Sequence, residues 1–215
     1  MRPQTVMDAI FNHPRVYRIK ISAVKLVAWP VSTLFIKNKI DPDAIVLKNI
    51  KPGESIYEIG CGDGNLYRLL SANGLAANFF GSDYNEHMVK FCAENYPEAQ
   101  WEVHKEGPYI QSDQKFDWCV IRNVLHHIPS ESDIVSTLRE AARISSRVLL
   151  IEPMQSDNSL LAIIKKRYWA ITDGGVNYFT LDQMHNLFMQ FPSRIHEESC
   201  TEPLHQTYTC LYSLR

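Results

Sequence analysis

Short apolar runs alternate with amphipathic stretches of helical period through the middle of the chain. The apolar runs lie at residues 55–59, 77–81, 100–104, 116–121 and 147–151. Each run has the length of one buried strand, and helical stripes at 65–72, 86–96 and 130–143 separate most of them. The alternation predicts a parallel sheet with helices on both faces.

The two ends of the chain follow other patterns. Residues 6–25 and 28–37 predict one or two helices broken near Pro30, and a short helix over 42–50 stops at Lys51-Pro52-Gly53. Between residues 154 and 178 the alternation gives way to an apolar helix and a glycine-containing loop. Thr180 then predicts the N-cap of a helix running to Phe191. Two last runs, 194–200 and 207–214, have no helix between them and predict an antiparallel pair at the sheet edge.

Length and composition favour one domain with an extension. A chain of 215 residues, 45% hydrophobic and 21% charged, can bury one good core and is short for two. We expect an N-terminal helical lid or extension over residues 1–50. The main domain covers 51–215, with a lid insertion at about 154–180.

Cysteine usage and hydropathy favour a cytoplasmic protein. The five cysteines are odd in number and form no Cys-x-x-Cys pair, so neither a disulfide framework nor a zinc site is predicted. We expect no metal. The N-terminus shows no cleavable leader, and the most apolar stretch, residues 21–36, is too short to span a bilayer and contains Lys25 and Pro30.

Charge is unevenly distributed. Residues 1–51 hold nine Lys or Arg against three Asp, a net +6, so the remainder carries −8 of the total −2. Such a basic arm could face an anionic substrate or a lipid surface, although a solvated helix face is the plainer explanation. The acidic body argues against nucleic acid as a partner.

The stretch from Glu58 to Gly64, EIGCGDG, joins a strand end to a helix start. Glycine permits a tight turn and lets a ligand lie against the main chain. The helix that follows offers free N–H groups, so the turn predicts a nucleotide-type ligand site. A dinucleotide fold would need its third glycine one place later, where this chain has Asn65.

This acidic-x-Gly-x-Gly-x-Gly pattern resembles the first motif of class I S-adenosylmethionine-dependent methyltransferases, with Glu58 closing the first strand and Cys61 inside the turn. The resemblance covers about residues 51–215. It implies a Rossmann-like α/β fold: a mostly parallel seven-stranded sheet that ends in an antiparallel hairpin, with helices on both faces. It also implies S-adenosyl-L-methionine as the cofactor.

Further polar residues fall where the other strands end. Asp83 lies nineteen residues past Gly64, where a carboxylate can accept hydrogen bonds from both hydroxyls of a ribose, or simply place a charge at the next helix start. Tyr84 and Met88 are candidates to flank an adenine ring, or to pack in the core. The resemblance implies that Glu106 accepts the adenine amino group, although the family more often shows Gly-Asp where this chain has Lys105-Glu106.

The fourth strand leads into Arg122-Asn123-Val124-Leu125-His126-His127, which resembles the fourth-strand motif of small-molecule methyltransferases. The resemblance implies that the backbone around Arg122, Asn123 and Val124 borders the methionine part of the cofactor. It also implies that a histidine faces the substrate. Histidine is a natural general base near neutral pH, so His126 and His127 are the catalytic candidates. Either could instead pack beneath the next helix.

The absence of certain motifs indicates that the acceptor is a small molecule. The basic N-terminal arm leaves room for an acceptor that is lipid-like or anionic. No Asn-Pro-Pro-Tyr or Asp-Pro-Pro-Tyr follows the fourth strand, and no Pro-Cys pair supplies the nucleophile of a cytosine enzyme. The predicted function is methyl transfer to oxygen, nitrogen or carbon by direct displacement, with the protein positioning the reactants. Two alternatives stay open: a non-catalytic binding or regulatory partner on the same fold, and a nicotinamide-dependent oxidoreductase. Five aromatic residues are expected near the pocket: Tyr17, Tyr109, Tyr168, Trp169 and Tyr178.

Overall fold

The structure, a computed structural model, describes residues 16, 19, 41–76, 78–104, 112–155, 175–200 and 207–215. These form a seven-stranded sheet in the order β3-β2-β1-β4-β5-β7-β6. The strands are β1 Ser55–Ile59, β2 Asn78–Asp83, β3 Gln100–Val103, β4 Phe116–Arg122, β5 Ser145–Pro153, β6 Ser193–Cys200 and β7 Thr207–Leu214. The helices are α3 Pro42–Asn49, α4 Asn65–Ala72, α5 Glu86–Asn95, α6 Glu131–Ile144 and α8 Leu181–Phe188, with a 3-10 turn at Leu125–His127.

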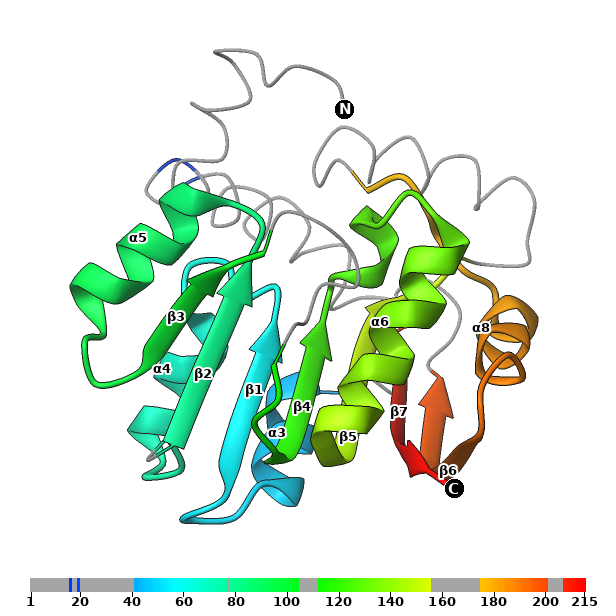
Figure 1. The fold of residues 1–215 in the computed structure, drawn as a ribbon, viewed down its shortest axis with the longest axis horizontal. Helices are drawn as coiled ribbons and strands as arrows, with labels where there is room; N and C mark the ends of the chain where they lie inside the picture. The colour runs from blue at the N-terminus through cyan, green and yellow to red at the C-terminus, as the bar shows by residue number, and fades with distance from the viewer. Residues whose placement is uncertain are drawn as a thin grey trace, which may run out of the picture.

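Strands β1 to β5 are parallel, so their carboxyl ends meet at one edge of the sheet (Figure 1). Strand β1 pairs with β2 on one side and β4 on the other, which makes this the point where strand order reverses. In an open parallel sheet a ligand binds beyond the carboxyl ends at such a point. The fold therefore places the glycine turn after β1 in the expected binding position.

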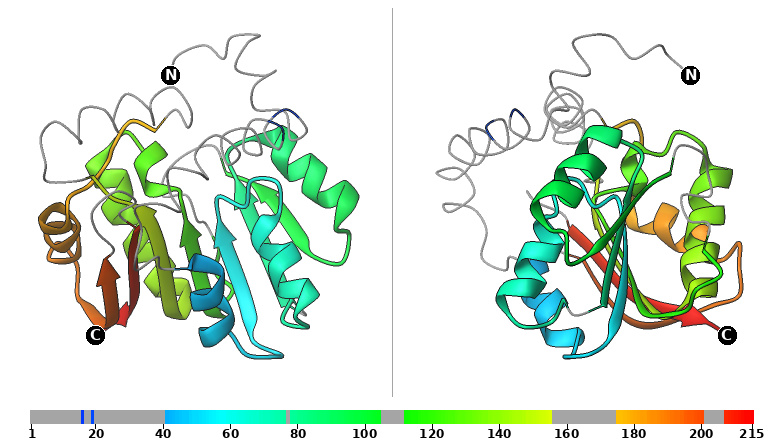
Figure 2. Two further views of the ribbon diagram at one scale, coloured as in Figure 1. Left: turned by 180° about the vertical axis from the view of Figure 1, so that it is seen from behind. Right: turned by 60° about the vertical axis from the view of Figure 1, so that its left-hand side comes forward.

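Helices cover both faces, with α3, α4 and α5 on one side and α6 and α8 on the other (Figure 2). The first side holds a core that includes Leu66, Leu70 and Trp118, and Val46 of α3 packs fully buried into it. The second side holds a core built from α6, α8 and the opposite face of the sheet, including Leu138 and Leu150. Both cores share the central strands, since successive side chains of a strand point to opposite faces.

The predicted fold class is confirmed, and β6 and β7 form the predicted antiparallel pair at the sheet edge. Strand β7 also pairs antiparallel with β5, so β6 is the outermost strand. The 3-10 turn after β4 was not predicted, because a three-residue turn leaves no period in the sequence. The helices expected at 6–25 and 28–37 lie outside the described residues, except for Val16 and Ile19. The domain boundaries stay a prediction.

Candidate functional site

The glycine turn is held by main-chain hydrogen bonds to the neighbouring strand. The N–H groups of Gly60 and Cys61 both donate to the Ser82 carbonyl, at 2.7 and 2.8 Å. Gly60 has a φ of +73°, and a Cβ atom added there would lie 2.3 Å from Cγ2 of Val124. Only glycine fits this close approach. At Gly62, with a φ of +51°, an added Cβ would meet nothing within 4 Å, so the main chain there is open to a ligand.

Asp83 joins the turn after β1 to the turn after β2. Its Oδ2 accepts from the Gly62 N–H at 2.9 Å, and its Oδ1 accepts from the Asn85 N–H at 2.9 Å. Burial raises the pKa of the Asp83 carboxyl, while these backbone N–H donors oppose the rise. Each carboxylate oxygen keeps a second lone pair, so the group can still accept from a ligand hydroxyl. Beyond it Tyr84 is 52% exposed, and Met88 is buried.

Glu58 is a buried carboxyl with an unused acceptor. It is 3% exposed at the end of β1, and its Oε2 has no hydrogen-bond partner among the described residues. Burial raises the pKa of this carboxyl well above its ordinary value, and the positive charge of Arg122 counteracts part of that effect. A buried polar atom normally has a partner, so the site calls for a donor that the described residues do not supply.

Arg122 ends β4 on the same face of the sheet as Glu58. Glu58 is opposite Val120 in the parallel register, and Arg122 follows two positions later. The Arg122 Nη1 lies 2.8 Å from Oδ1 of Asp43 in α3. Asn123, the next residue, has a positive φ of +58° and donates its N–H to the Ile151 carbonyl at 2.9 Å. Asparagine tolerates this left-handed conformation better than most side chains.

The turn from Val124 to His127 is fixed by a carboxylate from β5. One oxygen of Glu152 accepts from the N–H groups of Val124 and Leu125, at 2.6 and 2.9 Å. The other oxygen lies 2.8 Å from Nδ1 of His126. Both Glu152 and His126 are fully buried. Sequence analysis missed Glu152, although a carboxylate directly after the apolar residues 148–151 was a usable signal.

The two histidines of the turn lie in different surroundings. The His126 ring stacks on Tyr178, with centroids 5.7 Å apart, and the His126 carbonyl accepts from the N–H groups of Val176 and Asn177. His127 is exposed, and its ring centroid lies 4.1 Å from that of His126. His126 therefore holds the segment at residues 175–178 against the turn, and His127 is the more exposed of the two histidines among the described residues.

Several predicted residues cannot be placed. Glu106 and four of the five aromatic residues expected near the pocket, Tyr17, Tyr109, Tyr168 and Trp169, lie outside the described residues, as does most of the lid insertion. Only Tyr178 is described, and it packs on His126.

The described part of the chain contains no group of three His, Cys, Asp or Glu side chains that could hold a metal ion. None of its helices has the length and apolar character needed to cross a bilayer.

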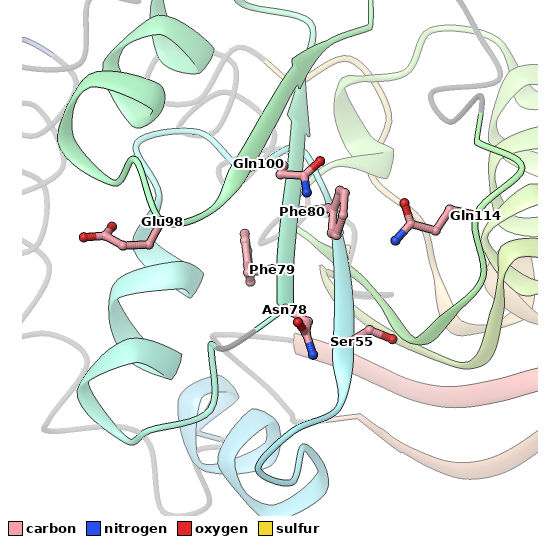
Figure 3. Close-up of a pocket in the computed structure, with 7 residues that line it drawn as sticks. All are labelled: Ser55, Asn78, Phe79, Phe80, Glu98, Gln100 and Gln114. Carbon is pink, nitrogen blue, oxygen red and sulfur yellow. The ribbon is translucent and has the colours of Figure 1, made fainter.

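A pocket of about 320 Å³ lies at the amino ends of β1 to β3, opposite the glycine turn (Figure 3). Its lining comprises Ser55, Asn78, Phe79, Phe80, Glu98, Gln100 and Gln114. It contains none of the predicted site residues. The chemistry of the site thus lies at the carboxyl edge, away from this pocket.

The residues at the carboxyl edge suit S-adenosylmethionine. One acceptor oxygen of Glu58 has no partner among the described residues, an added Cβ at Gly62 would meet none of them within 4 Å, and the Asp83 carboxylate joins the turns after β1 and β2. The sheet order, the terminal antiparallel hairpin and this glycine turn define a class I methyltransferase fold. The chain belongs to the methyltransferase domain family, whose sequence profile matches residues 39–192. The family predicted from the motifs is confirmed.

Comparison with individual proteins agrees with this family. Over 83 residues the chain is 26% identical to trans-aconitate 2-methyltransferase of Variovorax paradoxus strain S110, a match covering 39% of this chain and 32% of that protein. It also resembles magnesium protoporphyrin IX methyltransferase from Synechocystis PCC 6803, solved with bound SAH, at a TM-score of 0.58 and 16% identity over 94% of this chain and 99% of that one. A protein from Pyrococcus horikoshii OT3, PH0226, matches at a TM-score of 0.65 and 14% identity, over 80% and 87%. At these identities the two structures support the fold.

Proposed function

We propose that the protein transfers the methyl group of S-adenosylmethionine to a small-molecule acceptor. The observation that carries the proposal is the buried Glu58 oxygen, which has no partner among the described residues and ends the strand before a glycine turn where those residues leave Gly62 open. A buried acceptor of this kind is costly unless a donor reaches it. The ammonium of the cofactor's methionine part is such a donor, and family membership supports this choice of ligand.

In this proposal each site residue binds one part of the cofactor. Glu58 accepts from the ammonium, and the backbone of the glycine turn, Gly60 to Gly64 with Cys61, lies against the methionine and ribose parts. Asp83 accepts from the ribose hydroxyls, while the exposed Tyr84 covers one side of the adenine and Met88 the other. Glu106 accepts from the adenine amino group. The backbone of Arg122, Asn123 and Val124 forms the wall at the methionine end.

The bound cofactor supplies an electrophilic methyl group on a sulfonium, so the protein mainly orients the acceptor for direct displacement. A hydroxyl or an acidic carbon must lose a proton, and we assign this step to His127. His126 is fully buried, and its Nδ1 is hydrogen-bonded to Glu152. We therefore assign His126 the role of holding the turn in which His127 lies. An amine acceptor would not require this base.

We further propose an anionic acceptor and a cytoplasmic location. The basic N-terminal arm, nine Lys or Arg within residues 1–51, supports an anionic molecule. The name of the trans-aconitate enzyme, which denotes a polycarboxylate substrate, points the same way over a limited match. Sedimentation of the full chain with anionic and with neutral vesicles distinguishes a lipid-like acceptor from a soluble anion. Binding to neither would leave a soluble anion as the acceptor.

The test is calorimetric binding of S-adenosylmethionine and S-adenosylhomocysteine, with NADH as the comparison. We expect micromolar binding, about −8 kcal/mol, that is lost in Asp83→Ala and in Gly60→Arg, and no binding of NADH. Methyl transfer to a panel of anionic acceptors then separates an enzyme from a non-catalytic binding partner. An unmodified protein that binds neither sulfur compound would contradict the proposal.

A further inference from the structure

The ion pair between Asp43 and Arg122 lies at the methionine end of the candidate site. Its two atoms are 2.8 Å apart, and the residues are 79 positions apart in the chain. The two side chains differ in burial. The Arg122 side chain is 10% exposed, whereas the Asp43 side chain is 51% exposed. The guanidinium is therefore held by the fold, while its carboxylate partner stands in contact with solvent and can move away.

Arg122 and Glu58 together place a basic and an acidic group on one face of two neighbouring strands. The position of Arg122, two residues past the partner of Glu58, puts its side chain diagonal to that carboxyl. Glu58 is 3% exposed and keeps one oxygen without a partner in the described part of the chain. One acidic and one basic group side by side match the ammonium and the carboxylate of an α-amino acid. A guanidinium is well suited to bind a carboxylate through paired hydrogen bonds.

We propose that the Arg122 guanidinium has two alternative carboxylate partners, Asp43 and the α-carboxylate of the cofactor's methionine part, which compete for it. The inference rests on the proposed function and adds a regulatory contact to it. One carboxylate replaces another, so the charge at Arg122 stays balanced throughout the exchange. Glu58 keeps the ammonium of the same ligand beside it.

The exchange couples the cofactor site to helix α3. Asp43 lies in the first turn of α3, whose N-cap Asp41 accepts from the Asp43 N–H at 3.0 Å. The other end of the same helix is attached separately, through Lys48 and Glu197 of β6 at 3.1 Å. When the ligand carboxylate binds Arg122, the start of α3 loses its ion pair with β4. The ion pair between Lys48 and Glu197 still attaches the other end of α3 to β6. Cofactor binding thus releases the start of α3 from β4.

Two ligands that differ only at the amino-acid end test the competition. S-Adenosylhomocysteine carries the α-carboxylate, and 5′-methylthioadenosine lacks the amino-acid moiety. Affinities for both are measured calorimetrically on the full chain and on Asp43→Asn, Arg122→Gln and Arg122→Lys. Glu197→Gln is the matched control, since it removes the other α3 ion pair without touching Arg122. A thermal melt of each variant verifies folding.

We expect Asp43→Asn to bind S-adenosylhomocysteine about threefold more tightly, the effect of removing a partly exposed competitor. Arg122→Gln should bind it about tenfold or more weakly, and Arg122→Lys should recover part of this loss. Methylthioadenosine affinity should be unchanged in all of them. Glu197→Gln should leave both affinities unchanged.

Three results would overturn the competition while the proposed function stands. They are an unchanged or weaker S-adenosylhomocysteine affinity in Asp43→Asn, an equal loss of both ligands in Arg122→Gln, or the same gain in Glu197→Gln. If the unmodified protein binds neither ligand, the proposed function itself fails and the competition fails with it. The two failures are therefore distinguishable.

Discussion

Glu152 illustrates how much one buried carboxylate can organise. Its two oxygens accept from two backbone N–H groups and contact a histidine, so three consecutive residues after β4 take their positions from a side chain on β5. Val124, the first of them, is also the residue whose side chain closes on Gly60. The position of Val124 against Gly60 is thus set by a residue of β5.

The sequence motif identified some of these residues and missed others for a physical reason. Glycine spacing reports backbone conformation locally, so Gly60, Gly62 and Gly64 were identifiable, and all three have positive φ. The Asp43–Arg122 pair and the Glu152–His126 pair join distant segments, so no local pattern shows which residues pair. For the same reason the unequal surroundings of His126 and His127 could not be predicted from their adjacency.

Substituting Gly60 by alanine should destabilise the protein more than the same change at Gly53. Both have positive φ, +73° and +85°, so a side chain costs about 1 kcal/mol or more at either position. Only at Gly60 does the new Cβ meet Val124, at 2.3 Å, and such overpacking adds about 1–3 kcal/mol. Urea denaturation measures both. Equal losses would show that Val124 moves aside without cost.

Glu58→Gln should change how stability depends on pH. Because burial raises the folded-state pKa of Glu58 above its ordinary 4.5, the folded protein favours the protonated carboxyl. That preference is fully satisfied below the ordinary pKa, and stability falls as pH rises toward the raised value. Glutamine removes this effect. The variant should match the unmodified protein at low pH and become the more stable of the two as pH rises.

The measurement is the free energy of unfolding from urea titrations at several pH values. A variant that is less stable than the unmodified protein at every pH would contradict the expectation, and would mean that the ionised Glu58 contributes to the fold. Glu54→Gln is a suitable contrast, because hydrogen bonds from Lys51, Arg147 and Trp118 outweigh partial burial and lower the pKa of Glu54. Its stability should fall, relative to the unmodified protein, as pH rises.

Among the elements, those with strong local signals were predicted best. Strand β1 and helix α4 have the expected bounds, and Thr180 caps α8 as predicted. Strand β2 runs two residues beyond the predicted end, to Asp83, because its last residues pair with β3 rather than following an apolar pattern. Helix α8 stops at Phe188 rather than Phe191, although Phe191 still packs in the core.

Helix α8 depends on a capping box that a single substitution can remove. The Thr180 hydroxyl accepts from the Gln183 N–H at 3.3 Å, and the Gln183 side chain accepts from the Thr180 N–H at 2.9 Å. Thr180→Ala should cost about 1 kcal/mol, and Thr180→Ser much less, since serine also caps. Thermal unfolding compares the two variants. Equal stability of alanine and serine would show that the cap contributes nothing measurable.

At the scale of the whole molecule, two cores share one sheet, which predicts cooperative unfolding of the described domain. Trp118 lies in the core on the α3 and α4 face, while the α6 and α8 core lies on the other. Because the central strands contribute side chains to both cores, unfolding of the sheet disrupts both cores together. Urea transitions followed by tryptophan fluorescence and by far-UV circular dichroism should therefore coincide. Separated midpoints would mean that the faces unfold independently.

The general architecture was predictable because alternating strand and helix signals allow few arrangements. The place of β7 was not, since an antiparallel pair at the sheet edge can be joined through either strand. Here the later strand joins the sheet, and β5 pairs with β7 through six residue pairs, from Val148 with Tyr212 to Pro153 with Thr207. The edge of β5 is therefore covered by a strand from the end of the described chain.

This placement has a consequence for synthesis on the ribosome. Strand β6 emerges before β7 but cannot join the sheet until β7 has paired with β5. Throughout that interval β5, whose residues 148–151 are all apolar, presents an open edge in the nascent chain. An unpaired strand edge of this kind attracts other chains. The order of strands along the chain therefore leaves this edge of β5 uncovered until residues 207–214 have left the ribosome and paired with it.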